Sequence, residues 1–303
     1  MKLLKEGIYQ LDRSKVSSIN EKDIKNLEES ATKVDRLRSR VLYHTSPQSE
    51  PQHMLICFEA KSVVEVSFHS FAESFLIING VAQYRFYSSK DGTVINDVRM
   101  SPASMKGIFY TYISPNVAHR FFPLTKHVVA NEVGYSSFSP DKTFYGEGNL
   151  YDASNKVKSE ELATQPLIRN SDTNLIKISN EKYTFDSQIG VAEISYEMIE
   201  NLVRDSKNPF SILPSKKMTA FKKHDFDLEK LFVIPKNHKL ELNLENSIIH
   251  NIYGSINIIS KNINKNLDTK ENFVLGPIKS SRIIIQNIKS EFSIIHVVTE
   301  RNI

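Results

Sequence analysis

The sequence predicts an all-β protein of two barrel domains preceded by a short N-terminal helix. First, short apolar or alternating runs separated by turn residues recur from residue 41 onwards, a pattern typical of sandwiches and barrels. Second, helical spacing is confined to a segment before residue 36 and to a short one over 196–204. Third, a chain of 303 residues is long enough for two domains that each bury a core.

The N-terminal segment, residues 1–40, is expected to contain the first helix. Ser18 or Asn20 can cap it, because an acidic residue follows each of them three positions later. The apolar positions that follow have the three- and four-residue spacing of a helix: Ile24, Leu27, Ala31 and Val34.

The first barrel is expected over residues 41–138. Strands are predicted there at 55–58, 63–68, 75–78, 81–87, 108–113, 118–122 and 128–133. Residues 139–172 are polar and rich in turn residues, which predicts a linker or an extended arm. Strand-like runs return in residues 173–303, where a second β domain is expected.

Composition and charge exclude several classes of protein. The 39 basic and 35 acidic residues leave a net charge of +4, which is too small to predict nucleic-acid binding. No run approaches the roughly 18 apolar residues of a membrane helix, and charges interrupt the first six residues before a secretory core can form. The single cysteine, Cys57, excludes an internal disulfide and suits a reducing compartment. We therefore expect a cytoplasmic protein with no nucleic-acid or membrane partner.

One group of residues is suited to metal chemistry. His69 and Glu73 are four positions apart, so alternation along a strand would point both side chains to one face. Gly80 ends the apolar run that follows, as a tight turn between strands requires, and a later strand supplies His119. Two imidazoles and a carboxylate can converge on one cation inside a barrel, which predicts a metal site at His69, Glu73 and His119.

These residues resemble the two cupin motifs, G(x)5HxH(x)3-4E(x)6G and PxGxxH(x)3N. His69, Glu73 and Gly80 match the second half of the first motif, and Ser67 stands where the first histidine of its His-x-His pair would be. The run SPNVAH, which ends at His119, is similar to PxGxxH with serine and asparagine in place of proline and glycine. The resemblance implies double-stranded β-helix (jelly-roll) domains and one divalent first-row ion: zinc, iron, nickel or manganese.

The resemblance is most detailed for the WbuC-type cupins, over roughly residues 20–150. Arg40, His44 and Gln52 match positions that the WbuC-like pattern retains, and Glu132 matches its closing carboxylate. In this interpretation His44 or Glu132 moves a proton, and Arg40 and Gln52 bind the ligand. Tyr112 could stack on a sugar ring, although tyrosines at alternating strand positions are more often wall residues.

Each of these residues also has a structural interpretation. His69 and Glu73 could pair with each other across a filled core, and His119 could be a buried histidine that is satisfied by the backbone. Arg40 and Glu132 could form a structural ion pair. Ser67 is a poor ligand for a divalent ion, so a weak or absent metal is equally consistent with the sequence.

The second half carries no comparable motif. It resembles a cupin in outline only, through strands that look like the terminal barrel of mannose-6-phosphate isomerase, which is structural in that family. The histidines of this half are scattered, and we expect no metal site among them: His224, His238, His250 and His296.

Two functions follow from these observations. In the first, the protein is an enzyme that acts on a sugar or nucleotide sugar in bacterial surface-polysaccharide synthesis, a pathway implied by the resemblance alone. In the second, it is a metal-free, non-catalytic binding or accessory protein that has kept the pocket. Both take a small polar ligand such as a sugar or sugar phosphate as partner, and both leave a homodimer open.

Overall fold

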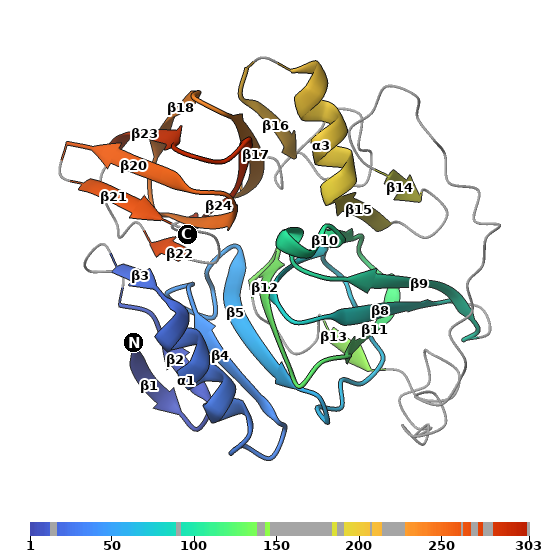
Figure 1. Ribbon diagram of the computed structural model, residues 1–303. Helices are drawn as coiled ribbons and strands as arrows, with labels where there is room; N and C mark the ends of the chain where they lie inside the picture. Colours follow the sequence, from blue (N-terminus) through green and yellow to red (C-terminus); the bar gives the residue numbers. More distant parts are fainter. Residues whose placement is uncertain are drawn as a thin grey trace.

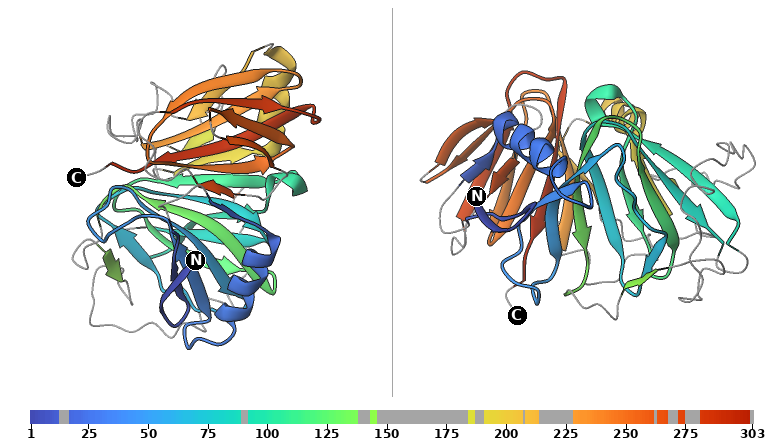
Figure 2. Two further views of the ribbon diagram at one scale, coloured as in Figure 1. Left: turned by 90° about the vertical axis from the view of Figure 1, so that its left-hand side faces the viewer. Right: turned by 90° about the horizontal axis from the view of Figure 1, so that it is seen from below.

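The protein forms two bodies of strands that lie against each other, as the computed structural model shows (Figures 1 and 2). The structure describes residues 1–12, 17–88, 92–137, 143–145, 184–186, 191–206, 208–213, 228–261, 263–267, 272–274 and 281–301. Strands dominate this part of the chain, and the predicted all-β class with a double barrel is confirmed. The predicted domain boundaries stay a prediction, and most of the expected linker lies outside the described residues.

The larger sheet has 14 strands and folds round to make the first barrel. Its strands lie in this order: β1 (Lys2–Lys5), β2 (Ile8–Gln10), β4 (Arg38–Leu42), β5 (Gln52–Glu59), β12 (His127–Gly134), β7 (Glu73–Asn79), β10 (Ile108–Ile113), β9 (Val94–Met100), β8 (Ala82–Tyr87), β11 (Ala118–Pro123), β6 (Ser67–His69) and β13 (Thr143–Tyr145). Beside this path, β15 (Val191–Ser195) pairs with β10, and β14 (Thr184–Asp186) pairs with β15.

Two smaller sheets make the second body, and most of their strands are coloured orange to red in Figure 1. The first contains, in order, β16 (Phe210–Leu213), β17 (Glu229–Pro235), β24 (Phe292–Thr299), β19 (Ser247–Tyr253), β22 (Asn272–Val274) and β3 (Ser17–Ile19). The second contains β18 (Lys239–Leu244), β23 (Ser281–Asn287), β20 (Ile256–Ser260) and β21 (Ile263–Leu267).

The two bodies exchange strands. β3, from the N-terminal segment, pairs antiparallel with β22 of the second body. β15, which follows the expected linker, pairs antiparallel with β10 of the first. Each body is therefore completed by a strand from the other part of the chain.

The helices α1 (Glu21–Ala31) and α3 (Tyr196–Asp205) begin at side-chain caps, and a 3₁₀ turn, η1, covers Ala103–Met105. The Asn20 side chain accepts from the backbone N–H groups of Lys22 and Asp23, and the Asp23 carboxylate accepts from the Asn20 N–H. The predicted cap at Asn20 is thus confirmed, although the helix ends at Ala31, before Val34. No helix in the described part of the chain is long and apolar enough to cross a membrane.

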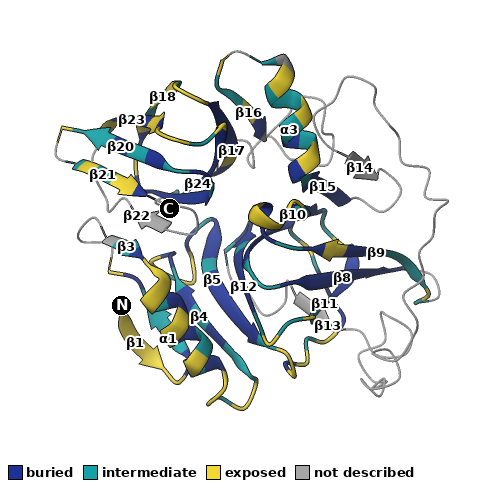
Figure 3. Ribbon diagram, in the orientation of Figure 1, coloured by how far each residue is buried: buried dark blue, intermediate teal, exposed yellow. Residues whose placement is uncertain are grey.

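Three large apolar cores and a smaller fourth cluster stabilise the described part of the fold, and Figure 3 shows buried residues along strands of both bodies. One core fills the first barrel with side chains from β5, β7, β8, β11 and β12, and another fills the second body. The third lies between the two bodies and includes residues of α1, β5, β7, β10, β17, β19 and β24. Alternation along β7 and β10 therefore sends one set of side chains into the first barrel and the other set toward the second body.

Candidate metal centre

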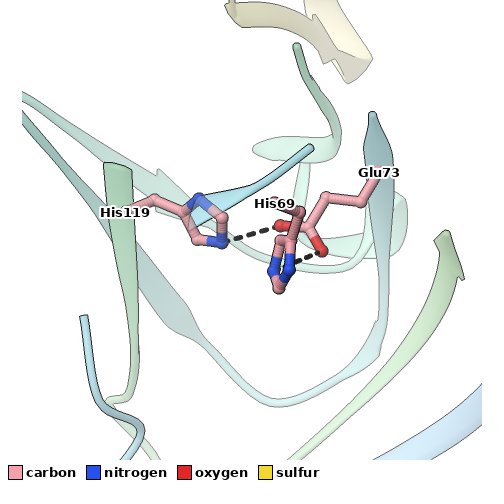
Figure 4. A group of neighbouring side chains, drawn as sticks. All are labelled: His69, Glu73 and His119. Atoms are coloured by element: carbon pink, nitrogen blue, oxygen red, sulfur yellow. Dashed lines mark ion pairs between the residues drawn. The ribbon is translucent and has the colours of Figure 1, made fainter. Parts of the chain in front are cut away.

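The structure brings the three predicted metal ligands together inside the first barrel (Figure 4). The Nε2 atom of His119 lies 2.7 Å from Oε1 of Glu73, and Nε2 of His69 lies 3.5 Å from Oε2 of the same carboxylate. One ligand atom from each residue lies within 4.8 Å of the other two. Glu73 and His119 are buried, and the His69 side chain, 15% exposed, lies nearest to solvent.

The convergence has a different cause from the one that the sequence indicated. His69 ends β6 and Glu73 begins β7, so the two residues do not alternate along one strand. Residues 70–72 form a bend between the strands, and this bend returns Glu73 beside His69. The ring of Phe71 in the bend stacks on His69, with centroids 5.0 Å apart. Gly134 of β12 makes room for this ring, since a Cβ at that position would lie 3.1 Å from it.

His119 is held in one tautomer. Its Nδ1 atom lies 2.8 Å from the carbonyl oxygen of Val117, and a carbonyl only accepts, so Nδ1 carries a hydrogen. In the neutral ring the Nε2 lone pair then faces Glu73 and the space between the ligands. A backbone carbonyl that fixes the distal nitrogen is typical of metal-binding histidines. Asn116 supports this turn by adopting φ +64°, the left-handed conformation that a glycine would supply.

The pKa shifts show how the three groups depend on one another. Burial lowers the pKa of His119, but the Glu73 carboxylate and the Val117 carbonyl outweigh it and raise this pKa above its ordinary value. Burial also lowers the pKa of His69, and although the Glu73 carboxylate opposes this shift, the charge of His119 adds to it and the pKa stays below its ordinary value. Burial raises the pKa of Glu73, yet the two histidines more than compensate and hold it below its ordinary value. The carboxylate is therefore ionised, as ligation requires.

Glu132 belongs to the same interior. In the β12–β7 pair it lies opposite Phe75, two positions from the Gly134–Glu73 pair, so Glu132 and Glu73 point to the same face of the sheet. Burial and the Glu73 charge raise the pKa of Glu132 to about 7, although the charges of Arg40, Arg38 and His119 oppose this rise. Arg40 lies opposite Ile56 in the β4–β5 pair, and Ile56 belongs to the core of the first barrel, so the Arg40 side chain is on the barrel-facing side of β4.

Aromatic side chains form the wall next to His119. The ring of Tyr84 lies 5.8 Å from the His119 ring and packs against Phe75 and Phe121, at centroid distances of 5.0 and 5.1 Å. The Tyr84 hydroxyl is buried and has no hydrogen-bond partner among the described residues. The packed barrel therefore holds a buried donor beside His119 that no described residue satisfies.

The remaining predicted residues lie elsewhere. Gln52 on β5 and Glu73 on β7 both lie opposite Gly134 of the intervening strand β12. The Gln52 amide, however, donates to backbone carbonyls of the 46–49 loop. His44 accepts from the backbone N–H of His53 and lines a small cavity between the two bodies. Tyr112 lies opposite Ser74 on the face of β10 that is directed to the second body, and its ring contacts Tyr135. The structure therefore groups Arg40 and Glu132 with the metal ligands, and places His44, Gln52 and Tyr112 away from them.

Comparison with known proteins supports the fold. A family described as a domain of unknown function, DUF6016, matches residues 19–100. No curated protein matches the chain. The crystal structure of salicylate 1,2-dioxygenase from Pseudaminobacter salicylatoxidans is similar, with a TM-score of 0.60 at 13% identity over 95% of this chain and 85% of that chain. The adduct of that enzyme with gentisate gives a TM-score of 0.59 at 13% identity over 95% and 82%.

These similar structures have the cupin fold, so the predicted cupin architecture is confirmed. At 13% identity the similarity extends to the fold alone. The His69, Glu73 and His119 group is an arrangement that could bind a metal in that fold. The closer resemblance to the WbuC-type cupins stays a prediction.

Proposed function

We propose that the protein is a cytoplasmic cupin that binds one divalent metal ion in its first barrel and acts there on a small anionic ligand. The observation that carries this proposal is the convergence of His69, Glu73 and His119 on one point. Two imidazoles and a carboxylate suit zinc, iron, nickel or manganese. A bound ion would supply Lewis-acid polarisation of a carbonyl or hydroxyl oxygen.

The geometry of the three residues fits a metal better than a filled core. The Val117 carbonyl takes the Nδ1 hydrogen of His119, so the neutral ring presents a lone pair to the centre. The pKa of Glu73 lies below its ordinary value, so this residue offers an anionic oxygen. Without an ion, the close contact between His119 Nε2 and the Glu73 carboxylate would require a charged imidazole in an interior lined by aromatic rings.

The ligand is proposed to be anionic because Arg40 faces the interior. Its guanidinium can make paired, charge-assisted bonds to a carboxylate or a phosphate. The Tyr84 hydroxyl is a buried donor with no partner among the described residues, and a ligand oxygen would satisfy it. A sugar phosphate of surface-polysaccharide metabolism has this chemistry, and the resemblance to WbuC-type cupins supports that choice.

Glu132 is the group proposed to hold and move a proton at its carboxyl oxygen. A pKa of about 7 lets the residue donate or accept a proton near neutral pH. His44, the other residue expected in this role, lies in the contact between the two bodies and has no place in this mechanism.

A second candidate is a metal-free binding protein, and one observation favours it. Ser67 lies directly opposite His119 in the β6–β11 pair, where the fourth ligand of a cupin would come from. Its hydroxyl is a poor ligand, so the carboxylate of Glu73 could serve only as the partner of two histidines. In this case the pocket binds the anion through Arg40 without catalysis.

Metal analysis of protein purified without chelator tests the choice. We expect one divalent ion per chain, which is lost when His69→Ala and His119→Ala are combined. His127→Ala is the matched control, since His127 pairs with Glu28 elsewhere in the same barrel and should leave the ion in place. If the wild type takes up no ion while sugar phosphates still raise its melting temperature, the binding-protein alternative replaces the metalloprotein.

A further inference from the structure

A buried carboxylate of the second body reaches the strand that carries the candidate metal ligand Glu73. Glu229, at the start of β17, is 2% exposed. The Ser74 hydroxyl lies 2.9 and 3.0 Å from its two oxygens, and the Tyr110 hydroxyl donates to Oε2 at 3.0 Å. The Tyr135 hydroxyl also donates to this carboxylate, and His296 contacts it from β24. Three donors from the first barrel thus converge on one acceptor from the second body.

These donors lie directly behind the candidate metal centre. Ser74 follows Glu73 in β7, so the Glu73 side chain points into the barrel and the Ser74 side chain points out toward Glu229. Tyr135 lies just after β12, and its backbone N–H donates to the Ala72 carbonyl at 2.9 Å. Glu229 therefore holds the segment 72–74 through Ser74 at one end and through Tyr135 at the other.

The chemistry of this contact makes it a rigid one. Three hydroxyl groups converge on the two oxygens of one buried side chain, so the position of each donor is fixed relative to the others. Removing the acceptor would leave these buried donors unpaired, which costs their full desolvation free energy. The position of β7 relative to the bend at residues 70–72 is thus determined by the second body as well as by the first barrel.

We propose that Glu229 is a positioning residue of the metal centre: it fixes β7 and the 70–72 bend, so that Glu73 meets His69 and His119 at ligating distance. The second body, whose own histidines were expected to bind no metal, then helps to set the geometry of the candidate metal centre in the first barrel. This inference rests on the proposed metal-binding function, and the first of the two readouts below tests the positioning of residues 72–74 without a metal.

Two variants and a matched control test the proposal in the full-length chain. Glu229→Ala removes the acceptor, and Glu229→Gln keeps an acceptor oxygen of the same shape without the charge. Glu300→Ala is the control, because Glu300 is also buried and also joins the two bodies, by accepting from the N–H and hydroxyl of Thr45. Thr45 follows β4 and lies away from the 69–74 segment in the sheet.

The first readout is amide hydrogen exchange of residues 66–76 in metal-free protein. We expect exchange in this segment to be fastest in Glu229→Ala, intermediate in Glu229→Gln, whose amide replaces one of the two acceptor oxygens with a donor, and unchanged in Glu300→Ala. The second readout is Co²⁺ affinity, followed by the visible absorption of the ion. Loss of a group that orients a ligand weakens metal binding by about 10- to 100-fold, and we expect Glu229→Ala to fall in that range.

The outcomes separate the two proposals. If the wild type binds no Co²⁺, the proposed function fails, and the exchange of residues 66–76 still decides the role of Glu229. If Glu229→Ala and Glu300→Ala change both readouts alike, Glu229 is an ordinary interface residue and the positioning role is refuted. Should Glu229→Ala fail to fold, Ser74→Ala in its place removes one donor, and unchanged exchange in that variant would equally refute the proposal.

Discussion

Replacing Ser67 by histidine should rebuild a complete four-ligand set. Ser67 lies opposite His119 on the neighbouring strand, and Cβ atoms of directly opposed residues are about 4.5–5.5 Å apart. Its side chain shares the barrel-facing side with His119, because opposed residues of a pair point the same way. An imidazole at position 67 would therefore enter the space where the three existing ligand atoms lie within 4.8 Å of one another.

The expected gain follows from the energy of complete sites. A structural zinc site with four ligands contributes about 10–16 kcal/mol, so one ligand of four supplies about 3 kcal/mol. That energy corresponds to metal binding that is roughly 100-fold tighter. Ser67 is only 8% exposed, so the larger ring should also crowd the metal-free barrel and reduce its free energy of unfolding by about 1–3 kcal/mol.

Competition of the protein with a chromophoric chelator for Zn²⁺ measures the affinity, and urea unfolding with and without metal measures the stability. Ser67→His should be less stable than the wild type without metal and gain more stability when metal is added. Ser67→Ala should match the wild type in affinity. Equal affinities for Ser67→His and Ser67→Ala would show that position 67 does not face the ions, and the motif assignment would then be wrong.

Three further predictions concern pH and backbone geometry. The pKa of Glu132 is raised from 4.5 to about 7, so the folded state keeps a proton that the unfolded state loses; the Glu132 contribution to stability should fall by about 3 kcal/mol as pH rises through this range, and this difference should appear when the wild type is compared with Glu132→Gln in urea titrations. Burial and the charges of His250 and His296 lower the pKa of His53 well below 6.5. The His53 contribution should therefore fall in the opposite direction, as pH drops below about 6.5, by at most about 1.4 kcal/mol per pH unit, and a slope in His53→Gln equal to that of the wild type would contradict this assignment. Gly80 has φ +80°, and a Cβ there would lie 2.2 Å from the His127 carbonyl oxygen, so Gly80→Ala should cost about 2–4 kcal/mol of unfolding free energy, and a loss below about 1 kcal/mol would contradict the geometry.

Local sequence patterns predicted several elements closely and others poorly: the strand expected at 63–68 begins only at Ser67, as β6, and no strand was expected where β9 lies. The strand expected at 108–113 has the same bounds as β10, and the one expected at 118–122 lies within β11. The Asn20 cap was visible because a capping box needs only neighbours in the sequence. Pairing between distant strands was not visible: β3 joins β22 and β15 joins β10, and nothing in the alternation of a strand specifies its partner.

The sequence predicted which residues form the candidate site, but not the backbone bend and the distant contact that position them. Spacing selected His69, Glu73 and His119, because the cupin motifs keep these positions apart by fixed numbers of residues. The bend at 70–72 was missed, since its phenylalanine continues the apolar pattern of a strand. Glu229 was missed for a different reason: its partners are Ser74, Tyr110 and Tyr135, all contributed by a distant part of the chain.

The strands β7, β10 and β12 serve the site and the contact between the bodies at the same time. Glu73 and Glu132 point from their strands into the first barrel, while Ser74 and Tyr110 point to the second body. A substitution on the outer face therefore acts on the ligands through the backbone of the same strand. Each body is also completed by a strand from the other part of the chain, which adds backbone hydrogen bonds to the connection between them. The carboxyl group of Glu229 contacts the back of the strand whose front carries Glu73, and this contact is the route by which we propose that the second body positions the candidate metal ligands of the first.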